Sequence, residues 1–303
     1  MLRNSLIGVR DAIAAGTGFV LAGSVPAARL LLRGTAPLAQ RFRIARRFHR
    51  QVVDSLAGRL KTRGGAMRTI RLGSVALTLD VSGFGARYHY FAGECYESET
   101  TQLFLSAIRP GDVVVDVGAN HGYFTVLSAQ LTGSAGRVTA FEANPGPIAI
   151  LERHVRANRV EDRVEIVEAA VSDRDGQQVQ FYVGNDDADL YSSICPSEFA
   201  LQQGWINPQR AITASTRSLD SWLAGRGRPH VRLLKIDVEG AEDLVVRGMA
   251  LMLAEAPPDY IVCETTWGSP AHNAFVGHGY QSEKLCGTED YGNMLYTRSE
   301  SVQ

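Results

Sequence analysis

Several features that mark large classes of protein are scarce or missing in this sequence. Only 4 of the 303 residues are cysteines, and none stand in a Cys-x-x-Cys pair, so neither a zinc site nor a disulfide framework is indicated. There is no internal repeat and no low-complexity tract. Residues 12–28 are uncharged, but they are too few and too polar for a membrane span, which needs about 20 largely apolar residues. Their apolar core is also weak for a signal peptide, so we expect a cytoplasmic protein.

The charge of the chain is unevenly distributed. Residues 1–71 hold 14 lysines and arginines against 2 acidic residues, a net charge of +12, and the remainder has a net charge of −13. We therefore expect a basic helical N-terminal extension over residues 1–71 and a larger domain over residues 72–303. A basic arm on an acidic body indicates an anionic partner, such as a membrane surface or nucleic acid, or docking of the arm on its own domain.

An amphipathic helix is predicted inside the extension. Its apolar residues recur at spacings of three and four, at Phe42, Ala45, Phe48, Val52, Leu56 and Leu60. Arginines crowd the rest of its first turns, at Arg41, Arg43, Arg46, Arg47 and Arg50. Such a helix either lies peripherally on the anionic inner face of the membrane or packs its apolar face on the protein. Both alternatives stay open from the sequence.

The most informative motif runs from Val113 to Gly122. Three valines lead into Asp116, and Gly118 and Gly122 follow, which predicts a buried strand, a tight turn and the start of a helix. A second apolar run ends in Glu142, where nucleotide-binding βαβ units place the acid that grips the ribose hydroxyls. The middle glycine of a dinucleotide fingerprint is replaced by Asn120. Asp116 would repel a pyrophosphate, whereas it suits a cationic ligand such as S-adenosylmethionine.

The order of apolar runs predicts an α/β fold. Strands are expected at residues 113–116, 137–142, 164–171, 231–237 and 260–264, with helices between them and an antiparallel pair at 280–285 and 294–297. This alternation predicts a doubly wound, mostly parallel sheet, which binds ligands at the carboxyl ends of its strands. The residues that we expect at those ends are Asp116, Glu142, Ala170, Asp237 and Glu264.

Two regions interrupt the pattern. Residues 71–81 are predicted as one strand, followed by a glycine-bearing segment at 82–93. Residues 172–216 are polar, and we expect a strand at 178–183 followed by a loop that faces the substrate.

The chain resembles the FkbM-type methyltransferases, a class I family that uses S-adenosylmethionine. The motifs that carry the resemblance are Asp116–Tyr123, Phe141–Pro145, Glu168–Asp173, Ser218–Asp220, Leu234–Glu242 and Val262–Glu264. One departure is Ala143, where a proline is usual. The resemblance implies a seven-stranded Rossmann-like sheet with one reversed strand, S-adenosyl-L-methionine as the cofactor, and small-molecule, sugar, glycolipid or polyketide acceptors. The first 71 residues have no counterpart in it.

Two sets of site residues follow. Methyl transfer to a hydroxyl needs an aligned acceptor and benefits from a base, for which Glu239 and Asp237 are the candidates. Asp237 has a second role open to it, binding the methionine part of the cofactor. A metal site at these two carboxylates is a third option, but the sequence shows no further cluster of oxygen ligands, so we predict none. The residues expected at the cofactor are Asp116, Gly118, Asn120, Gly122, Glu142, Asn144, Ala170 and Asp237.

The predicted function is transfer of a methyl group from S-adenosylmethionine to a hydroxyl oxygen. The alternatives are a non-catalytic module that binds S-adenosylmethionine, an N-methyltransferase and a nicotinamide oxidoreductase. Asn120 and Asp116 disfavour the last of these. A nucleic-acid acceptor is not expected, because no Asn-Pro-Pro-Tyr type motif is present.

Overall fold

The computed structural model describes residues 29–30, 32–34, 43–62, 66–184, 192–196, 201–202 and 206–298. The chain divides into two compact units, residues 1–98 and residues 99–303. Parts of the regions singled out in the sequence lie outside the described residues: the uncharged stretch 12–28, Phe42, and residues 185–191, 197–200 and 203–205 of the predicted substrate-facing loop. Within the described residues, no helix is both long enough and apolar enough to cross a bilayer.

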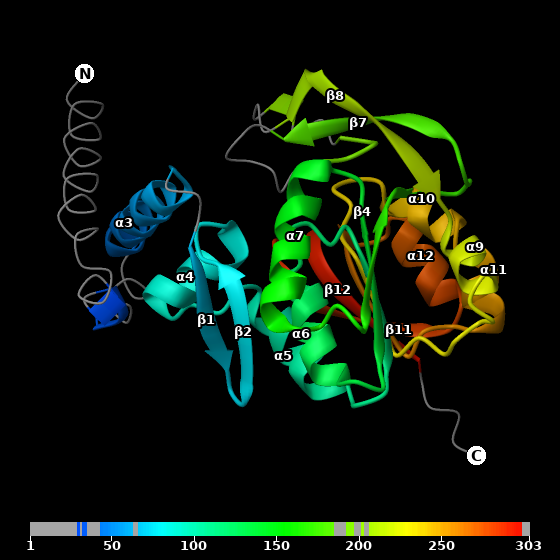
Figure 1. The fold of residues 1–303 in the computed structure, drawn as a ribbon. Helices are drawn as coiled ribbons and strands as arrows, with labels where there is room; N and C mark the ends of the chain where they lie inside the picture. Colours follow the sequence, from blue (N-terminus) through cyan, green and yellow to red (C-terminus); the bar gives the residue numbers. More distant parts are fainter. Residues whose placement is uncertain are drawn as a thin grey trace. The chain divides into compact units, whose positions relative to one another are not determined.

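The first unit combines helices with a β-hairpin (Figure 1). Its elements are α3 (Arg43–Thr62), β1 (Met67–Leu72), β2 (Val75–Asp80) and α4 (Phe84–Ala92). The predicted amphipathic helix is confirmed as α3, which packs against α4. Val52 and Leu56 of its apolar stripe are each only 2% exposed. At least this part of the stripe is therefore buried in the protein.

One prediction for this unit is wrong. Residues 71–81 do not form one strand, because Gly73, at φ +58°, and Ser74 make a two-residue turn that pairs Leu72 with Val75. The glycine-bearing segment 82–93 is largely the helix α4, which ends at Gly93 in the left-handed conformation. Gly83 and Gly93 flank this helix, and Gly85 lies within it.

The second unit is built on a seven-stranded sheet with the order β11-β12-β10-β9-β3-β4-β5. Only β12 runs against its neighbours, so the predicted doubly wound, mostly parallel sheet with one reversed strand is confirmed. The strands are β3 (Val113–Val117), β4 (Arg137–Glu142), β5 (Val164–Glu168), β9 (Leu233–Ile236), β10 (Tyr260–Thr266), β11 (Tyr280–Gly287) and β12 (Tyr291–Arg298).

Helices cover both faces of this sheet (Figure 1). The helices are α5 (Ser98–Ala107), α6 (Tyr123–Thr132), α7 (Pro145–Asn158), α9 (Leu219–Ala224), α10 (Glu242–Arg247), α11 (Ala250–Glu255) and α12 (Pro270–Gly277). All four residues of β9 are buried, as expected for a central parallel strand. Trp222, Met249 and Phe275 of the covering segments pack with Ile236 in one apolar core.

The region 164–217 departs from its prediction. The expected strand 164–171 is split, because β6 (Ala170–Val171) leaves the large sheet and pairs with β8 (Ile206–Arg217). β8 also pairs antiparallel with β7 (Gln178–Gly184), so its residues are not part of a loop as expected. β8 lies between β6 and β7 and pairs with both strands of this small three-stranded sheet. Only one of its side chains in two faces the protein, so its sequence is too polar to indicate a strand.

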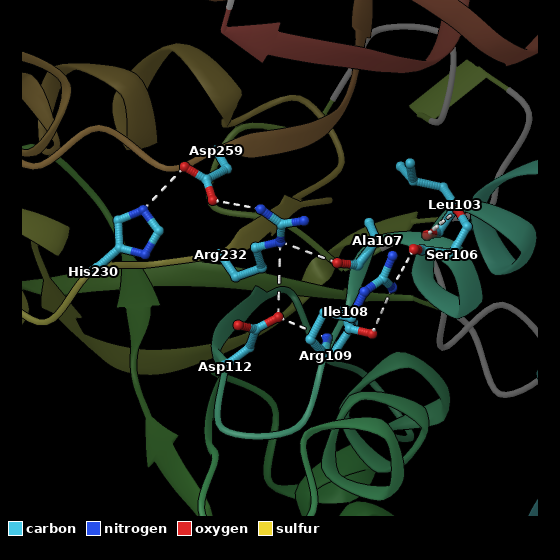
Figure 2. A network of polar contacts seen from close by, with 9 residues as sticks. All are labelled: Leu103, Ser106, Ala107, Ile108, Arg109, Asp112, His230, Arg232 and Asp259. Carbon is cyan, nitrogen blue, oxygen red and sulfur yellow. Dashed lines mark hydrogen bonds and ion pairs between the residues drawn. The ribbon is translucent and has the colours of Figure 1, made fainter. Parts of the chain in front are cut away.

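A polar network at the amino ends of the strands ties three of them together (Figure 2). Arg232, just before β9, donates to Asp259 Oδ2 at 2.8 Å and to the carbonyl oxygen of Ala107 at 3.0 Å. Its Nε also lies 3.7 Å from Asp112, which precedes β3. His230 contacts the second oxygen of Asp259 at 3.0 Å. The network therefore lies at the opposite end of the strands from the predicted site.

Replacing Arg232 by alanine should lower the free energy of unfolding by about 2 kcal/mol, because a half-buried, multiply bonded guanidinium is lost. Denaturant unfolding measures this value. Arg156→Ala is the matched control, since Arg156 makes one exposed i,i+4 pair with Glu152, worth about 0.5 kcal/mol or less. Equal losses in the two variants would show that the network adds nothing beyond a surface ion pair.

Candidate functional site

The carboxyl ends of four adjacent strands carry the acidic residues predicted from the sequence. In the parallel register Asp116 of β3 lies beside Lys235 of β9, and the pairing of Ile236 with Cys263 brings Asp237 next to Glu264 of β10. Glu142 ends β4 on the other side of β3. Because these strands are parallel neighbours, their acids share one edge of the sheet.

The turn after β3 requires glycine at position 118. Gly118 has φ +79°, and a Cβ there would lie 1.8 Å from the carbonyl oxygen of Asp237. The backbone N–H groups of Gly118 and Ala119 donate to the carbonyl oxygen of Phe141 at 3.0 and 2.9 Å. The ends of β3, β4 and β9 are therefore held in close backbone contact.

The Glu142 carboxylate organises the backbone of two turns. It accepts from the N–H groups of Asn120 at 2.8 Å, Ala143 at 2.9 Å and Asn144 at 2.8 Å. Burial raises the pKa of Glu142, and the three backbone donors oppose that rise. Since an ionised carboxylate offers about four acceptor positions, one remains for a further donor.

The other residues predicted at the cofactor support these turns. Asn120 is left-handed at φ +49°, and its Oδ1 accepts from the N–H of His121. Gly122, at φ +83°, precedes α6 and approaches Leu151. The Asn144 side chain caps α7, as predicted from its position before Pro145. Ala170 is buried in β6, outside the large sheet.

Asp116 is almost completely buried at 1% exposure. Its Oδ2 accepts from the Thr125 hydroxyl at 2.6 Å. Burial raises the pKa of Asp116, while the positive charge of Lys235 opposes the rise. Asp116 of β3 thus interacts with Thr125 of α6 through a hydrogen bond and with Lys235 of β9 through charge.

Lys235 forms a buried ion pair with Asp237. Its Nζ donates to Asp237 Oδ2 at 2.6 Å. Burial disfavours the ionised form of Asp237, but the charge and hydrogen bond of Lys235 outweigh it and hold its pKa below the usual value. Asp237 is therefore an ionised carboxylate beside a buried ammonium group.

Three carboxylates cluster beside this pair. One oxygen from each of Asp237, Glu239 and Glu264 lies within 4.8 Å of the others. Burial, the charge of Asp237 and the charge of Glu239 raise the pKa of Glu264 to about 10. Glu264 is thus protonated at neutral pH and hydrogen-bonded with Asp237. Two negative charges and one neutral acid remain, an arrangement that attracts a cation or accepts a proton.

A tight turn presents Glu239 at the end of β9. Glu239 has φ +54° and Gly240 has φ +104°, and the backbone bends at these two residues. Glu242 stabilises the turn by accepting from the N–H groups of Val238 and Gly240. Burial raises the pKa of Glu242 to about 7. The strained conformation of Glu239 is the kind that functional sites retain.

Two residues near the acids were missed in the sequence. Burial, followed by the charges of Glu264 and Glu239, raises the pKa of Tyr291, so its hydroxyl stays neutral near the cluster. Ser193 is 1% exposed and donates to the carbonyl oxygen of Val238 at 3.0 Å. No motif marks either residue, because Tyr291 begins the reversed strand β12 and Ser193 lies within the polar region 172–216.

Comparison with known proteins finds that the chain is similar to methyltransferases. Residues 116–287 match the family model described as "Methyltransferase FkbM domain". The chain is similar to the 31-O-demethyl-FK506 methyltransferase FkbM of Streptomyces tacrolimicus, with 34% identity over 60% of this chain and 76% of that protein. It is also similar to the 2-O-methyltransferase NoeI of Sinorhizobium fredii, with 31% identity over 46% of this chain and 58% of that protein. A crystal structure of methyltransferase FkbM from Methylobacillus flagellatus aligns at 13% identity with a TM-score of 0.40, over 70% of this chain and 52% of that one.

Proposed function

The chain belongs to the FkbM methyltransferase family, and from this premise we propose that it transfers the methyl group of S-adenosylmethionine to a hydroxyl oxygen. The observation that supports this most strongly is the convergence of Glu142, Asp237 and Glu239 at one edge of the sheet. The two relatives described above carry an O-methyl transfer in their names. A small-molecule, sugar, glycolipid or polyketide alcohol is therefore the proposed acceptor class.

The donor groups at this edge suit S-adenosylmethionine. The cofactor supplies an electrophilic methyl group on a positively charged sulfonium. Asp237 and Glu239 place negative charge where a cation would bind, and they would repel the pyrophosphate of a dinucleotide. Glu142 has room for a ribose hydroxyl beside its backbone donors. The remaining proposed cofactor contacts are Asp116, Gly118, Asn120, Gly122, Asn144 and Ala170, and several of these would act by shaping the turns.

Glu239 is the proposed base, and Asp237 is the proposed partner of the cofactor. A neutral alcohol is a weak nucleophile, so a carboxylate that takes its proton during the transfer lowers the barrier. Asp237 is already engaged by Lys235 at 2.6 Å, which reduces its basicity. Glu239 lies beside it in a half-buried turn. The Lys235 ammonium also serves as the counter-cation of Asp237, which supports chemistry without a metal ion.

Glu142→Ala should weaken the binding of S-adenosylmethionine by about 1.5–3 kcal/mol, because charge-assisted hydrogen bonds to the ribose are lost. Calorimetric titration measures the affinity, at a temperature where thermal melting shows the variant folded. Glu152→Ala, which removes an exposed glutamate on α7, is the control. Unchanged affinity in Glu142→Ala would remove Glu142 from the site.

An untargeted labelling experiment identifies the acceptor. Incubating the enzyme with methyl-labelled S-adenosylmethionine and fractionated cell extract should transfer label to a compound whose new methyl group is an ether. Label found on nitrogen would make the protein an N-methyltransferase. Absence of transfer from a protein that binds the cofactor would instead support a non-catalytic module.

We also propose that the basic N-terminal arm contacts anionic membranes reversibly on the cytoplasmic side. The support is the net charge of +12 over residues 1–71. Because Val52 and Leu56 are buried in the protein, the contact rests on charge more than on apolar insertion. Such binding should weaken as salt rises, since the Debye length shortens.

Replacing Arg46 and Arg47 of α3 by glutamine should weaken vesicle binding by about 2 kcal/mol, near 1 kcal/mol for each charge. Co-sedimentation with anionic vesicles measures this. Arg153→Gln with Arg156→Gln on α7 is the control that removes the same charge from exposed positions. Substitution is preferable to starting the chain at residue 72, because that cut would split the β1–β2 hairpin. Equal binding by both double variants would contradict the proposal.

A further inference from the structure

The first unit contains a cavity of its own. Its volume is about 490 Å³, and it is lined by residues of β1, by the end of α4 and by Arg29 and Arg33. That volume falls within the range of small-molecule sites. The lining residues with polar or backbone groups to offer are Arg29, Arg33, Thr69, Arg71, His89 and Gly93.

The cavity is lined by positive charge without a compensating acid. Three of its residues are arginines, and none of the lining residues is acidic. Arg29 Nε donates to the carbonyl oxygen of Tyr90 at 3.0 Å, and Arg33 donates to that of His89 at 3.2 Å. Carbonyl oxygens orient a guanidinium but do not neutralise it. Among the described residues, none of the three arginines is paired with a carboxylate.

Local contacts hold these groups in position. The Arg29 guanidinium lies 4.0 Å from the centre of the Tyr90 ring, and Tyr90 is 6% exposed. His89 Nε2 lies 3.0 Å from the carbonyl oxygen of Arg71, so this nitrogen carries the proton. The other ring nitrogen, Nδ1, is buried and has no hydrogen-bond partner among the described residues. Burial and the charge of Arg33 lower the pKa of His89.

We propose that this cavity binds a phosphate group, carried either by a soluble phosphorylated compound or by the headgroup of an anionic lipid. Guanidinium groups match phosphate oxygens in geometry and charge, and three arginines line this cavity. The volume exceeds what one phosphate fills, so the site has room for the group that carries it. The site is independent of methyl transfer, and it uses residues outside α3.

Arg71 offers the cleanest test. Its side chain is exposed on β1 and has no hydrogen bond or ion pair among the described residues, so Arg71→Ala should leave the unit folded. Arg68→Ala removes the same charge from the same strand outside the cavity, and is the matched control. The probes for the full chain are inorganic pyrophosphate, followed by calorimetry, and phosphatidylcholine vesicles with and without phosphatidylglycerol, followed by co-sedimentation.

Arg71→Ala should weaken binding of at least one probe about tenfold or more, and Arg68→Ala should leave it near wild type. Arg71→Lys should retain part of the affinity, because the charge remains while the forked geometry is lost. Loss confined to pyrophosphate assigns a soluble ligand, and loss confined to the charged vesicles assigns a headgroup. Failure of the wild-type chain to bind either probe, or equal weakening by Arg68→Ala, would overturn the proposal.

Discussion

Glu239→Gln should lower turnover by a factor on the order of 10² to 10⁴ while the affinity for S-adenosylmethionine stays near the wild-type value. The amide keeps the size and polarity of the side chain but cannot accept the proton of the acceptor hydroxyl. The turn should survive, because Glu242 stabilises it by accepting hydrogen bonds from the N–H groups of Val238 and Gly240. Single-turnover kinetics with an identified acceptor measures the chemical step directly.

Two variants make the Glu239 result specific. Glu283→Gln changes an exposed glutamate on the edge strand β11 and should have no effect on turnover. Asp237→Asn should weaken cofactor binding, turnover or both, because Lys235 then loses its ionised partner in a buried site. Full turnover in Glu239→Gln would mean that alignment alone drives the transfer and that the assigned base is wrong.

Gly118→Ala should be the most damaging substitution of a single small residue, with a loss of about 3–5 kcal/mol in the free energy of unfolding. The left-handed backbone costs a non-glycine residue about 1–3 kcal/mol. The added Cβ would also meet the carbonyl oxygen of Asp237 at 1.8 Å, and backbone cannot rotate away as a side chain can. Moving β9 away from β3 would displace Asp237, so cofactor binding should be lost as well.

Gly111→Ala separates the two causes of this loss. Gly111 is also left-handed, at φ +91°, but a Cβ there meets nothing within 4 Å. Gly111→Ala should therefore lower the free energy of unfolding by about 1 kcal/mol, which is the cost of the left-handed backbone conformation alone. Denaturant unfolding of the two variants gives the difference. Equal losses of unfolding free energy in Gly118→Ala and Gly111→Ala would contradict the prediction, because they would show that β9 can move away from β3 here at no cost in stability.

The central strands of the large sheet, β3, β4 and β9, were predictable from the sequence because they are buried on both faces. β4 has the predicted bounds, Arg137–Glu142, and the cap at Asn144 follows from side-chain chemistry alone. The small sheet was not predictable in the same way. β8 alternates polar and apolar residues against β7, and its pairing depends on contacts far apart in the chain.

The candidate site shows the same division. The spacing of Asp116, Glu142 and Asp237 along the chain predicts that they share an edge, since parallel strands end together. The partner of Lys235 could not be chosen among three nearby acids without side-chain geometry. The protonation of Glu264 likewise depends on burial and on the two carboxylates beside it, which only the folded chain brings within reach.

The central claim is that the strand ends of the second unit bind S-adenosylmethionine. Calorimetric titration of the full chain with S-adenosylmethionine and, under the same conditions, with NAD tests it most directly. We expect saturable binding of S-adenosylmethionine at one site, weakened by Glu142→Ala, and no binding of NAD, because the acids at the edge repel a pyrophosphate. Binding of NAD, or no binding of S-adenosylmethionine by the folded protein, would contradict the assignment of the site.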